Sequence, residues 1–315
     1  MKVAALAGGI GAGKFLRGLA RIVPGADLTV IVNVADDVVI HGLHVSPDPD
    51  SVTYWLGDVF DRERGWGRRD ETFRATEELR SFGAPDAWFG LGDRDLGTHL
   101  FRTQLLVGGV PLSEVTRRVA ARFGVRARLL PVSDDPIETR IECVEHETGE
   151  PLDLSFQEYW VQRRAADPVK ATRYDGAPAA APAPGVLEAL ADADAVVFCP
   201  SNPVVSIGPV LAVPGVRAAV AARRDRAVGV SGIVAGGPVA GMADKLMPAA
   251  GIEVTAAGVA AHYRDLLSGW VLDDVDRHLA PAVEALGMRV AACDTIMVDD
   301  ARAEAVARTA LGLLA

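Results

Sequence analysis

A glycine-rich turn between a strand-like run and a helical run constrains the fold of this chain more than any other feature. Residues 3–7 are apolar, the stretch LAGGIGAGKFLRG covers residues 6–18, and apolar residues then recur at helical spacing until Pro24. A second apolar run at residues 28–32 is continuous, as in strands that are covered on both faces. The pattern predicts a βαβ unit with the glycine turn at the end of its first strand.

The same alternation returns later in the chain. Further strands are predicted at residues 195–199, 227–231, 270–272 and 290–292, with helices at residues 186–190 and from about residue 300. Strands that alternate with helices predict an α/β protein with a Rossmann-like, doubly wound, mostly parallel sheet.

Residues 51–124 interrupt this alternation. Charged, helix-forming stretches such as DETFRATEELRSFG dominate there, and no part of the segment has a convincing strand pattern. We therefore expect a Rossmann-like core built from residues 1–50 and 125–315. The helical insertion at residues 51–124 is expected to form part of the substrate pocket.

Composition narrows the classes of partner. The chain has 315 residues and is half hydrophobic, and its net charge of −10 argues against a nucleic-acid surface. Prolines interrupt its longest uncharged run, at residues 195–216, so no membrane span is expected. The three cysteines form no C-x-x-C pair, and no signal-peptide pattern is found at the first residues. We expect reduced thiols and a cytoplasmic protein.

The glycine turn partly fits two nucleotide-binding signatures. The P-loop pattern G-x-x-x-x-G-K is present, but Phe15 stands where a Ser or Thr should bind the metal ion. The dinucleotide pattern G-x-G-x-x-G also begins correctly, but Lys14 replaces its third glycine. We predict that the turn holds phosphate through Gly8, Gly9, Gly11, Gly13 and Lys14. The alternative is a turn that only packs a strand against a helix.

Two acidic stretches follow the second predicted strand. NVADD covers residues 33–37 and VSPDPDSV covers residues 45–52. Carboxylates at one sheet edge beside a phosphate-binding turn suit a hard divalent cation, so we predict Mg²⁺ held by Asp36 and Asp50. Asp48 could equally cap a helix that starts near Ser51.

Two further stretches carry candidate binding residues. LGDRDLGTH ends at His99, a substrate-binding candidate, and contains Arg94, whose guanidinium could clamp a phosphate or carboxylate. A solvated surface turn would have the same composition. In CPSNPVVSIGP, Ser201, Asn202 and Ser206 follow a predicted strand and could contact a base or ribose, although turn chemistry explains Asn202 before a proline equally well.

Taken in order, several motifs make the chain recognisable. GGIGAGK, NVADD, SPDPDSV, GLGDRDLGTH, LLPVSDDP, FQEYWV and PSNPVVSIGP together resemble the 2-phospho-L-lactate transferase family of coenzyme F-420 biosynthesis. The resemblance covers essentially the whole chain. The stretch GWGRRDET, residues 65–72, is similar to the actinobacterial branch, which is associated with a phosphoenolpyruvate-derived donor.

The resemblance implies a homodimer that joins two small molecules. The donor would be a guanosine diphosphate diester that carries enolpyruvate or lactate. The acceptor would be the deazaflavin 7,8-didemethyl-8-hydroxy-5-deazariboflavin, whose terminal ribityl hydroxyl attacks the distal phosphorus while GMP leaves. No nucleic acid or membrane takes part.

The resemblance also implies roles for individual residues. The glycines and Lys14 would hold the diphosphate, and the segment from Ser201 to Ser206 would face guanosine. Positions that match Asp50 and Arg94 contact the deazaflavin in the family, so these two are the catalytic candidates. A non-catalytic regulator of the related fold that binds a nucleotide-sugar is the alternative. A nicotinamide-dependent oxidoreductase is disfavoured because the third glycine is missing.

Overall fold

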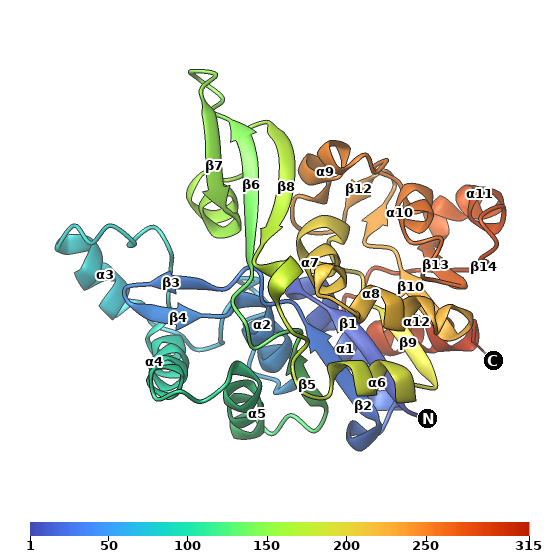
Figure 1. Cartoon of the computed structure of the whole chain (residues 1–315), viewed down its shortest axis with the longest axis horizontal. Helices are drawn as coiled ribbons and strands as arrows, with labels where there is room; N and C mark the ends of the chain where they lie inside the picture. The colour runs from blue at the N-terminus through green and yellow to red at the C-terminus, as the bar shows by residue number, and fades with distance from the viewer. Residues whose placement is uncertain (315) are drawn as a thin grey trace.

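A seven-stranded parallel sheet forms the centre of the molecule (Figure 1). The computed structural model describes residues 1–314. The strands lie in the order β14 (Arg289–Cys293), β13 (Gly269–Asp273), β10 (Ala227–Val230), β9 (Ala195–Phe198), β1 (Val3–Ala7), β2 (Leu28–Val32) and β5 (Arg128–Pro131). Every neighbouring pair is parallel, which confirms the predicted doubly wound α/β fold.

Helices cover both faces of this sheet. The helices of the chain are α1 (Gly9–Ile22), α2 (Pro47–Leu56), α3 (Arg74–Ser81), α4 (Asp93–Val107), α5 (Leu112–Arg122), α6 (Val186–Asp192), α7 (Gly208–Ala212), α8 (Val216–Ala221), α9 (Ala243–Leu246), α10 (Ala256–His262), α11 (Ala280–Glu284) and α12 (Asp300–Gly312). Of these, α3 and α4 lie beside the β3–β4 hairpin (Figure 1). Within residues 1–314, none of the helices has both the length and the apolar character that a membrane crossing needs.

The alternating side chains of β1 show why the sheet is buried on both sides. Val3, Ala5 and Ala7 belong to one hydrophobic cluster, which α1 and α12 complete. Ala4 and Leu6 belong to a second cluster on the opposite face, where α6, α8 and α10 pack. A strand covered on both faces needs a continuous apolar run, which is the pattern read from the sequence.

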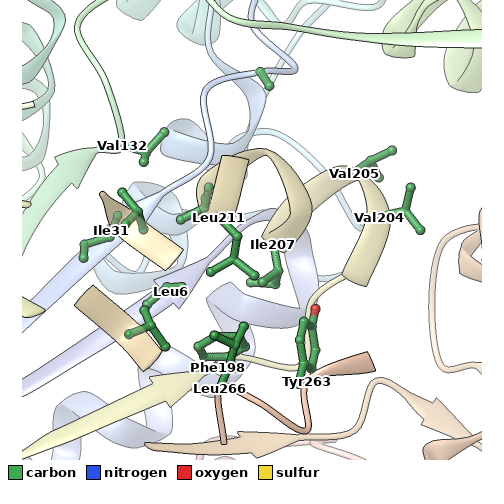
Figure 2. Close-up of a cluster of buried hydrophobic side chains, with 14 of the residues drawn as sticks. Leu6, Ile31, Val132, Phe198, Val204, Val205, Ile207, Leu211, Tyr263 and Leu266 are labelled. Carbon is green, nitrogen blue, oxygen red and sulfur yellow. The ribbon is translucent and has the colours of Figure 1, made fainter. Parts of the chain in front are cut away.

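The carboxyl end of β1 lies at the topological switch point of the sheet. The chain runs from β1 outward to β2 and β5 on one side, and returns to β9 on the other side of β1. In open α/β sheets, ligands bind in the crevice at this point. Figure 2 shows the packing beneath it, where Leu6, Phe198 and Ile207 belong to one buried cluster.

Most predicted elements are confirmed, and one boundary is wrong. The strands β1, β2, β9, β10, β13 and β14 and the helices α1, α6 and α12 lie where the sequence places them. The helix expected to start near Ser51 begins at Pro47 instead. Proline is favoured at the first position of a helix, because the amide hydrogen that it lacks would have no partner there.

Three antiparallel elements are absent from the sequence-based prediction. A hairpin of β3 (Val38–Ile40) and β4 (Leu43–Val45) follows β2, and a sheet of β7 (Pro151–Ser155), β6 (Glu138–Val144) and β8 (Val169–Asp175) follows β5. Figure 1 shows both extending away from the central sheet, the hairpin above α4 in that view. A short pairing of β11 (Ile233–Val234) with β12 (Gly237–Pro238) follows β10.

Candidate active site

The glycine turn and the segment after β9 meet at the switch point. The Ser201 hydroxyl donates to the Gly8 carbonyl at 2.9 Å and accepts from the Gly8 amide at 3.3 Å. A Cβ atom added to Gly8 would lie 2.5 Å from Asp48 Oδ2 and 2.7 Å from Ser206 Cβ. The fold therefore brings together three segments that the sequence marked separately, and only glycine fits at their meeting point.

The remaining glycines of the turn are required for different reasons, one by backbone conformation and two by close packing. Gly9 has a φ of +73°, in the left-handed region, and begins α1. A Cβ atom at Gly11 would lie 2.5 Å from the Pro200 carbonyl oxygen, and one at Gly13 would overlap the Trp55 ring. Close packing alone therefore requires glycine at these last two positions, which is the alternative that the sequence left open.

Lys14 lies in the second turn of α1 and is half-buried. Within residues 1–314, no hydrogen bond or ion pair engages its ammonium group. The flexible four-carbon stem of lysine leaves that charge able to reach an anion at the start of α1.

Asp48 and Asp36 form a pair of buried carboxyl groups beside the glycine turn. Asn33 donates its side-chain amide to Asp48 Oδ2 at 2.9 Å and to the Val205 carbonyl at 3.1 Å. Burial raises the pKa of Asp48 to about 7. Burial and the nearby Asp48 charge raise the pKa of Asp36 well above its usual value.

This carboxyl pair is not balanced by any cation. In the part of the chain that the structure describes, neither Asp36 nor Asp48 takes part in an ion pair, and Asp36 Oδ1 is buried with no hydrogen-bond partner. Buried carboxylate oxygens are normally paired or bound to metal. The pair therefore has the charge and the free ligand atom that a divalent cation needs.

Asp50 belongs to a different cluster, built mainly on α4. Both Asp50 oxygens accept from the Arg102 guanidinium, with Nη1 at 3.0 Å from Oδ2. The same Nη1 lies 3.1 Å from His99 Nδ1. His99 Nε2 lies 3.6 Å from Asp95 Oδ2, and the Tyr54 hydroxyl donates to Asp95 Oδ1. All five side chains are buried, so this is a buried polar network around one ion pair.

The two predicted metal ligands thus have different partners. Asp36 interacts with Asp48, whereas Asp50 is paired with Arg102. A dication at Asp50 would have to approach a buried guanidinium, which costs Coulombic energy. Asp48 and Asp50 both lie in the first turn of α2, so neither is the N-cap, which is Ser46.

The remaining predicted site residues are placed as follows. Arg94 is exposed in the first turn of α4, and its guanidinium lies 3.9 Å from Asp70. Asn202 Oδ1 accepts from the amides of Val204 and Val205, so its carbonyl oxygen caps the π-helical turn that follows. This matches the turn chemistry that the sequence left open.

A second acidic cluster, in the segments that follow β6 and precede β8, was not predicted. Glu145, His146 and Asp167 are, within residues 1–314, the only three ligand-bearing side chains of this kind whose ligand atoms all lie within 4.8 Å of one another. Arg163 donates to Asp167 and, at 3.0 Å, to Glu145. Its hydrogen bond holds the pKa of Asp167 well below the usual range.

The spacing of polar residues in the sequence of α4 indicates this buried network, although the network was not among the predictions. Asp95, His99 and Arg102 are spaced at four and three residues, which places them on one face of a helix. A polar stripe on the buried face of an otherwise ordinary helix indicates an internal network. Tyr54 and Asn33 had no such signal, because their partners are distant in sequence.

Fold and site together define an α/β protein whose candidate site combines a glycine turn with uncompensated carboxyl groups at the switch point. Residues 3–310 match the family described as 2-phospho-L-lactate transferase CofD. The chain belongs to this family and is a phosphotransferase.

Similar proteins agree with this assignment along the whole chain. A protein of Streptomyces griseus named phosphoenolpyruvate transferase is 52% identical over 314 residues, covering 99% of this chain and 98% of its own. A protein of the same name from Thermobifida fusca is 46% identical, with the same coverage. A UPF0052 family structure from Bacillus halodurans has a TM-score of 0.60 at 19% identity and covers 100% of this chain and 98% of its own, which supports the fold.

Proposed function

We propose that the chain transfers a phosphoenolpyruvyl group from a guanosine diphosphate diester to the deazaflavin 7,8-didemethyl-8-hydroxy-5-deazariboflavin, in coenzyme F-420 biosynthesis. The observation that carries the proposal is the full-length similarity to proteins named phosphoenolpyruvate transferase, at up to 52% identity. The 2-phospholactyl group, implied by the name of the family, is the competing choice of donor.

The reaction forms one phosphodiester bond and breaks the phosphoanhydride bond between the two phosphates of the donor. The terminal ribityl hydroxyl oxygen bonds to the distal phosphorus, the bond from that phosphorus to the bridging oxygen breaks, and GMP leaves with the electron pair. The hydroxyl proton passes to solvent or to a carboxylate. Such transfers depend on orientation and charge neutralisation rather than on covalent help from the protein.

The donor half of the site would lie at the glycine turn. The amino end of α1, a helix of 14 residues, begins at Gly9 and offers backbone amides and a positive dipole end to a diphosphate. Lys14 would add a mobile positive charge. Ser206, buried beside Gly8, and the segment from Ser201 would face the guanosine.

Mg²⁺ fits the carboxyl pair of this half. An incoming diphosphate would meet Asp36 and Asp48, and two carboxylates repel such an anion unless a cation lies between them. When bound, the metal ion would offset the charge on the transferring phosphate. We propose two metal ligands: Asp36, which was predicted from the sequence, and Asp48. Asp50, the other ligand predicted from the sequence, could bind the metal ion only if its ion pair with Arg102 broke.

The acceptor half would be built on α2 and α4. Each carboxylate oxygen has two lone pairs, so Asp50 can hold Arg102 and still accept a hydrogen bond from a substrate hydroxyl. Exposed Arg94 could contact a polar edge of the flat ring. The place of residues 51–124 in this pocket, the homodimer and the cytoplasmic location belong to the same proposal.

Mass spectrometry of the product tests this function. The protein is mixed with Mg²⁺, the deazaflavin and either the enolpyruvyl or the lactyl donor, whose products differ by a pair of hydrogen atoms. We expect the enolpyruvyl adduct and release of GMP. Absence of both adducts, together with no binding of the deazaflavin, would favour the nucleotide-sugar-binding regulator instead.

A further inference from the structure

We propose that Arg102 is a positioning residue that fixes the Asp50 carboxylate for the acceptor, and that His99 in turn fixes Arg102. The inference rests on the proposed function for the identity of the acceptor. It goes beyond it because neither the sequence motifs nor the roles implied by the family include Arg102.

The contacts of Arg102 leave its guanidinium a single orientation. It donates to both oxygens of Asp50, to His99 Nδ1 at 3.1 Å and toward the His44 carbonyl at 3.4 Å. A guanidinium is planar, and its bidentate bonds to a carboxylate fix both distance and angle. Because Arg102 lies on α4 and Asp50 on α2, the ion pair also fixes the two helices relative to each other.

His99 contacts the guanidinium of Arg102 through one ring nitrogen. A guanidinium has no acceptor, so His99 Nδ1 must accept the hydrogen bond from Arg102 and cannot carry a proton. The other ring nitrogen, Nε2, is buried and lies 3.6 Å from Asp95 Oδ2.

The charge of Arg102 divides the site into two halves. With Arg102 beside it, Asp50 is electrically compensated and suits a neutral hydroxyl, whereas the Asp36–Asp48 pair is uncompensated and suits a cation. Loss of the guanidinium fork should therefore disturb the acceptor and leave donor and metal binding in place. A purely structural ion pair would show no such selectivity.

The test compares Arg102→Lys with Arg163→Lys. Arg163 also makes a bidentate pair with an aspartate, Asp167, but in the segment between β7 and β8. Lysine keeps the charge and loses the planar fork. We expect Arg102→Lys to lower kcat/KM for the deazaflavin by roughly 10²-fold, the scale of a small misplacement of reacting groups. The KM for the donor should stay within about twofold, and Arg163→Lys should leave both kinetic constants unchanged.

His99 variants keep the proposal testable if Arg102→Lys does not fold. Asparagine at this position retains an acceptor oxygen near the place of Nδ1, and leucine does not. We expect His99→Asn to keep more of the kcat/KM for the deazaflavin than His99→Leu, with unfolding temperatures that differ little.

The outcomes separate this proposal from the proposed function. Wild-type kinetics in Arg102→Lys, with a lower unfolding temperature, would make Arg102 purely structural and overturn the inference. Equal losses for donor and deazaflavin would overturn it as well. A wild-type protein that makes no product with either donor contradicts the proposed function instead. In that case, fluorescence titration measures the affinity of the deazaflavin for wild type and for Arg102→Lys. Equal affinities would contradict a positioning role for Arg102.

Discussion

Two acidic clusters in this molecule differ in how their charge is balanced. Beside the sheet of β6, β7 and β8, Glu145, His146 and Asp167 have three ligand atoms within 4.8 Å of one another, but Arg163 already pairs with two of them. At the carboxyl edge of the central sheet, Asp36 and Asp48 lie near a third carboxyl group, Asp37, which pairs with His44. Within residues 1–314, no cation pairs with Asp36 or Asp48. If only the number of closely spaced ligand atoms counted, the first cluster would be the candidate metal site. The balance of charge favours the second cluster instead.

The pKa values of the two clusters shift in opposite directions for this reason. The Arg163 hydrogen bond lowers the pKa of Asp167, whereas burial without a cation raises that of Asp48 to about 7. A raised carboxyl pKa in a crevice at the switch point is the combination expected of a functional site. A lowered pKa in an ion-pair network is what a structural cluster shows.

The largest effect is expected from Asp36→Asn, which removes a charge from the unbalanced pair. Turnover should fall by roughly 10³-fold, the upper end of the loss seen when one transition-state contact is removed. The rise in unfolding temperature caused by Mg²⁺ should also disappear. Glu145→Gln, the matched change in the other cluster, should preserve both. The reverse result would place the metal ion beside the sheet of β6, β7 and β8.

Asp50→Asn should cost less and should leave metal binding intact. Removing the charge leaves Arg102 buried without its partner and removes the proposed hydroxyl acceptor, so turnover should fall by about 10²-fold. The Mg²⁺ concentration that gives half-maximal rate should not change, because Arg102 keeps the metal ion away from this side chain. An increase in that concentration would instead identify Asp50 as a metal ligand, as the sequence first suggested.

Mg²⁺ binding should depend on pH through the carboxyl pair. Burial raises the pKa of Asp48 to about 7, above the value of about 4 for an unfolded chain, so its protonation stabilises the fold at low pH, and this stability is lost as pH rises toward about 7. Mg²⁺ requires the ionised form, so its affinity should fall about tenfold for each pH unit below 7. Thermal shifts at pH 6 and pH 8 measure this. A shift that is the same at both values would contradict metal binding by Asp48.

The central sheet was predictable because its strands carry their signal locally. A strand covered on both faces, such as β1, is a continuous apolar run followed by a turn. In β6, Thr139, Ile141 and Cys143 are buried while charged residues alternate with them. Those charges are balanced by other strands, as Arg173 on β8 pairs with Glu142 on β6. A short strand rich in charge has the composition of a loop until its partners are known.

The site was predictable only as a set of segments. Sequence places Asp36, Asp48 and Asp50 near one sheet edge, but their partners decide their chemistry. Asp50 forms an ion pair with Arg102, which lies 52 positions away in the sequence. No local pattern reports whether a carboxylate in the first turn of a helix is balanced by a cation from another helix. The assignment of Asp50 rather than Asp48 to the metal ion therefore depended on a contact that spacing does not reveal.

The smallest effect is expected from Lys14→Ala, which removes a positive charge from the donor half of the site. Lys14 is half-buried and unpaired within residues 1–314, and an ion pair at such a position contributes up to about 1 kcal/mol, or roughly fivefold in affinity. The Kd of the donor should rise by that factor and the Kd of the deazaflavin should not change. Lys170→Ala, an exposed change on β8, is the matched control and should affect neither ligand. Equal weakening of both ligands by Lys14→Ala would mean that the lysine supports the turn rather than the phosphate.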